Sequence, residues 1–311
     1  MDSWALDMSR SCSRGFWASS APSNRMSAAI SATLRRQWAA TRFILSHVAR
    51  NRSLVCVVAH PDDDAHAVAG SVALHAEEAD FQFILVHATY GELGDIREGF
   101  PATRETLAAV RRAEDEAAWR ALGRVPDRHE WLGLPDGGLS SLPLDDVVAM
   151  VERILVEEQP AVVATFGPEG ISGHPDHVTI GAATDAAFAR VRGRGGSGFQ
   201  RLLHTAVPQS AVDRWNRRRA ELGLFEFEPT EVYHLRGVPD AQIGITVDCR
   251  AVAGRIGAGL REHRSQHHVM SDVPDNPEQW DKRIKDECHV IAWPPREPGA
   301  PMLTDLFDDL T

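Results

Sequence analysis

The alternation of short apolar runs with helical patterns constrains this chain more than any other feature of its sequence. Leu54 to Ala59 (LVCVVA) is a continuous, β-branched apolar run, as expected for a strand buried on both faces of a parallel sheet. A helical pattern follows at 65–79, and a second apolar run at 81–88. Such an alternation is typical of a parallel sheet covered by helices.

The same rhythm continues to about residue 191 and weakens after the glycine-rich stretch at 192–198. It predicts an α/β fold with a doubly wound, mostly parallel sheet and helices on both faces. Beyond 198 we expect strands at 202–207 and 243–247 and a helix at 250–263. The other expected elements are helices at 103–122, 144–158 and 177–191 and strands at 130–132 and 161–166.

Charge and composition divide the chain into three parts. Residues 1–52 carry eight Arg against two Asp, a net charge of +6. Because the whole chain carries −11, residues 53–311 carry −17. We expect 1–52 to be a basic N-terminal extension, disordered or partly helical, 53–270 to be the enzyme domain, and 271–311 to be a Pro- and acid-rich tail that completes the fold. The acidity of the main part disfavours nucleic acid as a partner.

The cysteines and the hydropathy indicate the compartment. The four cysteines lie far apart and form no C-x-x-C pair, so neither a disulfide framework nor a cysteine zinc site is predicted. No apolar run reaches the 18 residues or so that a transmembrane helix needs. We therefore expect a cytoplasmic protein without a transmembrane segment, and the sequence is compatible with a homo-oligomer.

Two short blocks share one plan. His60-Pro61-Asp62-Asp63 follows the first strand, and His174-Pro175-Asp176-His177 follows the strand at 161–166. In open α/β sheets this carboxyl edge is where ligands bind. A proline suits the first helical position, so the residues at i and i+3 of each block are expected to face one way.

His60, Asp63 and His177 together offer three metal ligands. Three protein ligands and one open position are the pattern of a catalytic zinc site. We therefore expect one Zn²⁺ per chain, with Fe²⁺ or another divalent ion as alternatives.

The remaining side chains of the two blocks suit the chemistry of hydrolysis. Asp62, next to a ligand but not needed as one, suits the general base that takes a proton from the attacking water. His174 is expected to stabilise the oxyanion in its protonated form, with Asp176 holding its tautomer and charge. The prediction is hydrolysis of an amide bond.

These residues belong to an ordered set of motifs, and with it the sequence resembles the PIG-L (LmbE-like) zinc-dependent N-deacetylases from about Leu54 to Gln266. The resemblance implies a Rossmann-like fold and removal of an N-acyl group, usually acetyl, from an amino-sugar-type small molecule. It implies the same roles for the residues of the two blocks. The motifs are A-H-P-D-D-D at 59–64, T-Y-G-E-L-G at 89–94, R-R-A-E at 111–114, L-P-D-G at 134–137, G-H-P-D-H at 173–177 and H-R-S-Q at 263–266.

The resemblance also implies that Glu92, Arg111 and Asp136 line the sugar-binding cleft. For Arg111 a surface ion pair with Glu114, three residues further along a helix, is the alternative. H-R-S-Q suits a helix end as well as a site.

Two positions depart from the pattern of the family. Asp64 replaces the usual Glu, and either acid would favour a helix start. Ser172 stands where members of the mycothiol pathway carry Tyr, which argues against a mycothiol precursor as substrate.

Four alternatives stay open at this point. The first is an amidase acting on a mycothiol-type thiol conjugate. The second is a two-His-one-carboxylate iron oxygenase, since His60-x-Asp62 with a distant His also fits that triad, although such enzymes use all-β jelly rolls. The third is a metal-holding protein without activity, against which the presence of Asp62 and His174 argues. In the fourth, each His-Pro-Asp is only a helix cap; two such blocks at strand ends argue against it.

Overall fold

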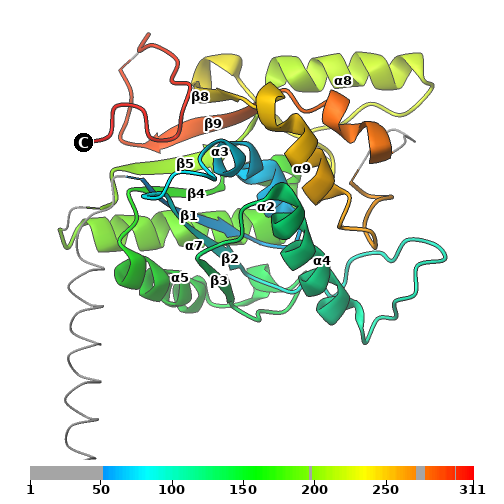
Figure 1. Cartoon of the computed structure of the whole chain (residues 1–311), viewed down its shortest axis with the longest axis horizontal. Helices are drawn as coiled ribbons and strands as arrows, with labels where there is room; N and C mark the ends of the chain where they lie inside the picture. Colours follow the sequence, from blue (N-terminus) through cyan, green and yellow to red (C-terminus); the bar gives the residue numbers. More distant parts are fainter. Residues whose placement is uncertain (1–51, 196–197, 271–276, 298) are drawn as a thin grey trace, which may run out of the picture. The chain divides into compact units, whose positions relative to one another are not determined.

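The computed structural model describes residues 52–195, 198–270, 277–297 and 299–311 (Figure 1). Seven strands of this part form one sheet in the order β3-β2-β1-β4-β5-β9-β8. Strands β1 to β5 pair in parallel, whereas β9 is antiparallel to both β5 and β8. The strands are β1 (Ser53–Val58), β2 (Gln82–His87), β3 (Arg128–Trp131), β4 (Val162–Phe166), β5 (Arg201–Thr205), β8 (Ile243–Asp248) and β9 (Asp286–Trp293).

The strand order contains a switch point between β1 and β4. From β1 the chain moves outward through β2 to β3, then returns to β4 on the other side of β1 and continues to β5. The crevice outside the carboxyl ends of β1 and β4 is where such a sheet binds ligands. The expected α/β fold with a mostly parallel sheet is confirmed, and it excludes the jelly roll that the oxygenase alternative requires.

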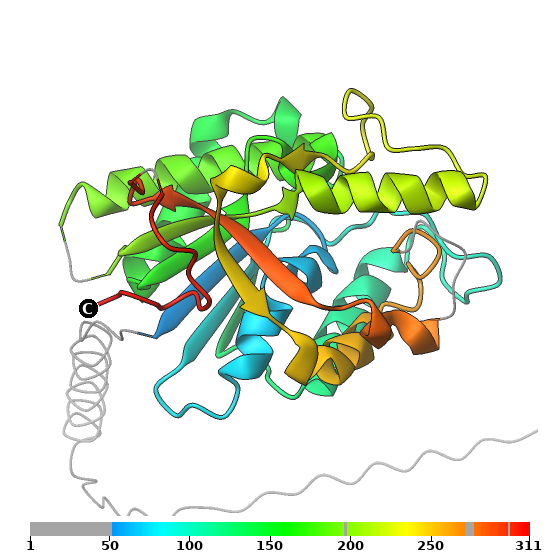
Figure 2. The same cartoon turned by 90° about the horizontal axis from the view of Figure 1, so that it is seen from above.

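Helices cover both faces of the sheet. Figures 1 and 2 show α5 and α7 against one face and α3, α4 and α9 on the other. None of the helices in the described ranges is long and apolar enough to span a lipid bilayer. The helices are α2 (Asp63–Ala67), α3 (Ala69–Leu74), α4 (Leu107–Leu122), α5 (Leu144–Glu158), α6 (Gly170–Gly173), α7 (Pro175–Arg192), α8 (Gln209–Glu221) and α9 (Ala253–Leu260).

Residue patterns explain the regular elements of the core. All six residues of β1 are buried, as its unbroken apolar run predicts. Helix α5 has the bounds expected from the sequence, and it buries Val147, Val151 and Ile154, which share one face at helical spacing. Gln159 follows it with φ 46°, in the left-handed conformation that commonly ends a helix.

The helix expected at 65–79 is wrong, because the structure has two short helices, α2 and α3, with a break at Val68 (φ −143°). The break exposes the first N–H groups of α3 to a buried acceptor: Glu287 Oε2 accepts from the N–H groups of Gly70 and Ser71 at 2.9 and 3.2 Å. Because Glu287 lies more than 200 residues away along the chain, local periodicity carries no sign of this break.

The C-terminal part contributes directly to the sheet. The Pro- and acid-rich composition predicted no strand there, yet β9 pairs with both β5 and β8. Leu306 is fully buried in the main core. Helix α8 and a two-stranded parallel sheet of β6 (Val207–Pro208) and β7 (Gly237–Val238) were also not expected from the sequence. The expected extension at 1–52 lies outside the described residues, except for Arg52.

Candidate metal centre

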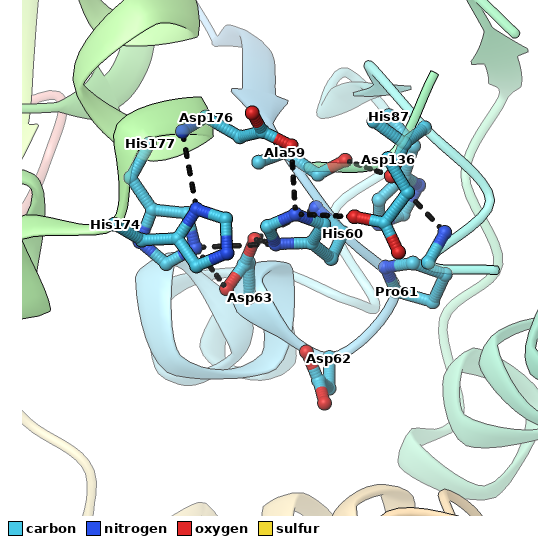
Figure 3. Close-up of polar contacts among 12 residues, drawn as sticks. Ala59, His60, Pro61, Asp62, Asp63, His87, Asp136, His174, Asp176 and His177 are labelled. Atoms are coloured by element: carbon cyan, nitrogen blue, oxygen red, sulfur yellow. Dashed lines mark hydrogen bonds and ion pairs between the residues drawn. The ribbon is translucent and has the colours of Figure 1, made fainter. Parts of the chain in front are cut away.

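The first donor turn connects β1 to α2. Its backbone is unusual at Asp62, which caps α2 with φ 109° and ψ −27°, a conformation that a non-glycine residue rarely adopts. Such strain concentrates at functional sites, where it directs a side chain. Asp62 and Asp63 point different ways from this turn, and Figure 3 shows Asp63, not Asp62, among the histidines. Pro61 precedes the cap of α2, so the expectation that it opens this helix is wrong.

The second donor turn leads into α7. His174 is the N-cap and Pro175 the first residue of α7, as expected for this block. His177, in the first turn, stacks on Phe166 at the end of β4 with ring centroids 4.2 Å apart. Its Nδ1 lies 3.0 Å from the carbonyl oxygen of Gly170. Because a carbonyl only accepts, Nδ1 carries the proton and the lone pair of Nε2 is free for a metal.

His60, Asp63 and His177 meet at the carboxyl edge of the sheet (Figure 3). The Nε2 atom of His177 lies 3.2 Å from His60 Nδ1 and 3.2 Å from Asp63 Oδ1. His60 Nδ1 lies 3.2 Å from Asp63 Oδ2. Ligands with bonds of about 2.0 Å to one tetrahedral ion are separated by about 3.3 Å. The three donor groups therefore fit one divalent ion.

Two carboxylates fix the orientation of His60. Its Nε2 lies 3.1 Å from Asp136 Oδ1 and 3.4 Å from Asp176 Oδ2. Because carboxylates only accept, Nε2 carries a proton, so a divalent ion beside Asp63 and His177 would take the place of the proton on Nδ1. This is the outer-shell arrangement that supports a metal-ligating histidine.

The charge of this cluster favours a cation. Burial alone would lower the pKa of His60, but hydrogen bonds with Asp136, Asp176 and Asp63 raise it well above its usual value. Several buried carboxylates thus depend on one imidazole for compensating charge, which a divalent ion would supply more fully. By proximity alone, His60 could also hold an ion with His174 and His177, or with Asp136 and Asp176. The Nε2–H of His60 faces Asp136 and Asp176, which argues against an ion in that set. His174 Nδ1 accepts from the N–H of Asp176, so its Nε2 is protonated, which argues against His174 as a ligand and favours the set with Asp63.

The pKa values of Asp62 and Asp63 are shifted in opposite directions. Burial raises the pKa of Asp62, and Arg111 only partly opposes this rise. Burial would also raise the pKa of Asp63, but His177 and His60 hold it well below its usual range. Neighbouring carboxylates with diverging pKa values commonly divide the roles in acid–base chemistry. Asp63 suits a permanently ionised ligand, and Asp62 suits a proton acceptor.

Arg111 holds the carboxylate of Asp62 and two backbone carbonyl groups near it. Its Nη2 lies 3.1 Å from Asp62 Oδ2 and 2.6 Å from the carbonyl oxygen of Pro61, and its Nη1 lies 3.0 Å from that of Gly91. Gly91 has φ +64°, and a Cβ there would lie 2.2 Å from the guanidinium, so only glycine leaves room for Arg111. Arg111 and Glu114 are both buried, so the alternative of a surface ion pair is wrong.

Glu114 and the H-R-S-Q segment bind each other. The N–H and hydroxyl of Ser265 donate to the carboxylate of Glu114 at 2.8 and 2.6 Å. Gln266 donates to the carbonyl oxygen of Asp95 at 2.9 Å. The motif thus links the segment after α9 to α4 and to the loop after β2. The sequence had suggested a role at a helix end or in the site instead.

His174 presents a donor in a different form from the one expected. The N–H of Asp176 donates to His174 Nδ1 at 3.1 Å, so the proton of the neutral ring is on Nε2. Burial and the charges of His60 and His177 lower the pKa of His174 to about 4. The ring is therefore neutral at pH 7, where we expected it to be protonated, but Nε2–H remains available as a donor.

The side chain of Asp176 contacts a different histidine from the one expected. Its carboxylate accepts from the N–H groups of Gly137 and Leu139 at 2.7 and 3.1 Å and lies against His60. Asp176 does hold the tautomer of His174, as expected, but through its main-chain N–H, whereas its carboxylate contacts His60.

Glu92 and Asp136 support the candidate metal ligand His60 through a chain of contacts. Glu92 Oε1 accepts from the N–H of Asp136 at 3.0 Å, and Asp136 Oδ2 accepts from that of Leu93 at 2.7 Å. Asp136 is buried, and its other oxygen faces His60. Together with Arg111, these residues support the donor turns; whether they also line a sugar cleft stays a prediction.

A buried network that was not predicted from the sequence lies next to the first donor turn. Asp64, 1% exposed, accepts from Trp119 Nε1 at 2.6 Å and lies 3.3 Å from His87 Nε2. His87 Nδ1 lies 2.9 Å from His129 Nε2, and Asp115 lies beside both rings. Asp64 is thus a buried hub, not only an acid at a helix start. The third Asp of A-H-P-D-D-D was the only local signal of this network.

Comparisons with known proteins identify the family. The family model described as PIG-L: GlcNAc-PI de-N-acetylase matches residues 55–188, which include both donor turns. A 1D-myo-inositol 2-acetamido-2-deoxy-alpha-D-glucopyranoside deacetylase of Frankia casuarinae is 31% identical over 250 residues, covering 70% of this chain and 81% of the relative. A deacetylase of Saccharomonospora viridis with the same substrate name is 30% identical over 284 residues, covering 83% and 100%.

Solved structures share the fold at lower identity. The N,N'-diacetylchitobiose deacetylase of Pyrococcus horikoshii has 23% identity and a TM-score of 0.51, covering 80% of this chain and 84% of that one. A 4-carboxy-2-hydroxymuconate hydratase of Pseudomonas putida has 16% identity and a TM-score of 0.52, covering 79% and 98%. Because a hydratase shares the fold, the fold alone does not decide the activity. The more similar sequences do, and this chain belongs to the PIG-L family and is an N-deacetylase.

Proposed function

We propose that this chain is a zinc-dependent hydrolase that removes the N-acetyl group from a 2-acetamido-2-deoxy-glucopyranoside. The observation that carries the proposal is the set of 3.2 Å distances that join His177 Nε2 to His60 Nδ1 and to Asp63 Oδ1, and His60 Nδ1 to Asp63 Oδ2. Two imidazoles and one carboxylate with an open position are typical of catalytic zinc. The substrate class rests on relatives named for 2-acetamido-2-deoxy-alpha-D-glucopyranoside deacetylation.

The chemistry divides among the residues of the two turns. A bound zinc ion supplies Lewis acidity that acidifies water and polarises a carbonyl group. Asp62, held by Arg111, accepts the proton that water loses as its oxygen attacks the amide carbon. His174 donates from Nε2–H to the oxygen that gains negative charge. When the C–N bond breaks, the nitrogen takes up the proton, and acetate and the free amine leave.

The proposal is tested with a panel of amides. Purified protein is treated with a chelator, reloaded with zinc or ferrous iron, and assayed for released acetate and amine. The panel contains an N-acetylglucosaminyl inositol, methyl N-acetylglucosaminide, diacetylchitobiose and N-acetyl-lysine. We expect turnover of the glucosaminides, its loss after chelation, and its return with zinc. Equal turnover of N-acetyl-lysine, or full activity in chelated protein, would contradict the proposal.

A further inference from the structure

The segment that follows α8 runs back to the second donor turn. The N–H of Tyr233 donates to the carbonyl oxygen of Ser172 at 2.9 Å, and that of Arg236 donates to the carbonyl oxygen of Ile171 at 2.7 Å. These bonds join the segment to the residues immediately before His174. Whatever occupies the space beside His174 therefore meets this segment as well as the metal donors.

Arg236 and Gly173 fix this attachment. A Cβ at Gly173, whose φ is +67°, would lie 2.1 Å from the guanidinium carbon of Arg236. The guanidinium thus packs directly on the backbone that leads into His174. This packing and the two hydrogen bonds hold the segment on the turn and set the position of Tyr233.

Tyr233 is held where its side chain contributes little to folding. Its φ is 70°, a conformation that disfavours a bulky side chain. The residue is 70% exposed. Its ring lies edge-on to His174 with centroids 5.2 Å apart. The strained backbone and the exposed ring beside His174 leave an aromatic surface available for contact with a ligand.

We propose that Tyr233 forms a subsite for the sugar ring, next to the amide that His174 contacts. The proposal rests on the function proposed above. The exposed ring offers an apolar surface to the C–H groups of a pyranose, while His174 Nε2–H faces the amide oxygen. The contact involves the aromatic ring, so the phenol hydroxyl is not required.

The test compares variants at Tyr233 with a matched control. Phe225 belongs to the same segment and is 91% exposed, and its main-chain oxygen accepts from Arg219 Nε at 2.6 Å. With a glucosaminide as substrate, Tyr233→Ala is expected to raise KM about 10-fold or more with kcat nearly unchanged, as expected when substrate contacts shared by ground and transition states are lost. Tyr233→Phe and Phe225→Ala are expected to stay within about twofold of the wild type.

A third variant separates substrate binding from a structural role. Tyr233→Gly relieves the positive φ, so its Tm should equal or exceed that of the wild type while KM rises as in Tyr233→Ala. An unchanged KM, a fall in kcat without a rise in KM, or a clear fall in Tm for Tyr233→Gly would each overturn the subsite. If the wild-type enzyme hydrolyses no glucosaminide, the proposed function fails, and the subsite fails with it. If the wild-type enzyme hydrolyses a glucosaminide and the Tyr233 variants have the same KM, only the proposed subsite fails.

Discussion

Two histidines at the ends of adjacent strands, His60 after β1 and His87 in β2, have nearly the same surroundings. Each directs Nε2 to a carboxylate, Asp136 at 3.1 Å for His60 and Asp64 at 3.3 Å for His87. Each directs Nδ1 to another imidazole, at 3.2 Å for His60 and 2.9 Å for His87. By residue type alone, both clusters could hold a metal ion.

The clusters differ in their place in the fold. His60 lies beside the switch point and next to His174. The other two candidate metal ligands come from the turns after β1 (Asp63) and β4 (His177). His87 is fully buried and stacks on Trp131 at 4.5 Å. Asp115, beside His87, has two carboxylate oxygens without hydrogen-bond partners among the described residues. Position relative to the switch point, not the ligand types, is the reason for proposing the first cluster as the catalytic one and the second as its support.

The largest expected effect separates ligand from base within the first cluster. Asp63→Ala should lose both metal and turnover, because it removes one of three ligands. Asp62→Asn should keep the metal and lose a factor of about 10² to 10⁴ in kcat, because an amide keeps the shape but cannot accept a proton. Elemental analysis and steady-state kinetics on the same preparations measure both. Loss of metal from Asp62→Asn but not from Asp63→Ala would show that the roles are exchanged.

Removal of His174 should give the next largest effect. His174→Ala is expected to retain the metal and to lower kcat by about 10² to 10³, the usual cost of losing one oxyanion donor. His129→Ala, in the second cluster, is the comparison: it removes an imidazole of similar burial that faces no substrate, and should lower kcat far less. Equal losses of kcat in the two variants would mean that the clusters do not differ as described.

Asp136→Asn tests the support of His60. We expect metal affinity to fall about 10- to 100-fold, because an amide either loses the acceptor that fixes the His60 tautomer or accepts more weakly. Turnover at saturating metal should be much less affected. Titration with zinc against a chelating competitor measures the affinity, with the exposed Asp95→Asn as a matched control. Unchanged affinity would show that Asp136 acts on substrate rather than on His60.

The sequence was sufficient to predict the sheet and which side chains meet at the candidate metal centre. The apolar run of β1 and the helical pattern of α5 are local signals, and tertiary contacts did not override them. The convergence of His60, Asp63 and His177 could be predicted because their turns follow strands that border the switch point, where side chains meet. Residues in such turns have few alternative positions.

The supporting residues could not be assigned, because their partners are distant in sequence. Asp176 is adjacent to His177 and was paired with His174, but the fold places its carboxylate on His60, 116 residues away. Asp64 at the start of α2 does not indicate its burial against His87 and Trp119. The break between α2 and α3 depends likewise on Glu287. Local pattern predicts which residues face an edge of the sheet, and tertiary packing decides which partner each one meets.

The smallest expected effect tests whether the second cluster is structural. Burial and the nearby charge of Asp64 hold the pKa of Asp115 well above its usual range, so the folded state keeps this carboxyl neutral while the unfolded chain ionises near pH 4. Stability from this group is therefore fully present below about pH 4 and is lost as pH rises through the raised pKa. Asp115→Asn imitates the neutral acid and does not titrate.

We expect Asp115→Asn to raise the free energy of unfolding at pH 8 by about 1–3 kcal/mol, on the scale of one unsatisfied buried polar group, and to change it little at pH 4. Metal content and kcat should remain close to the wild-type values, because no ligand or reacting group is altered. Denaturant unfolding at the two pH values, with elemental analysis alongside, makes the measurement. A variant that loses one bound ion per chain and becomes less stable would show instead that Asp115 is ionised and, with His87 and His129, holds a cation, and the two clusters would then be alike in function as well as in composition.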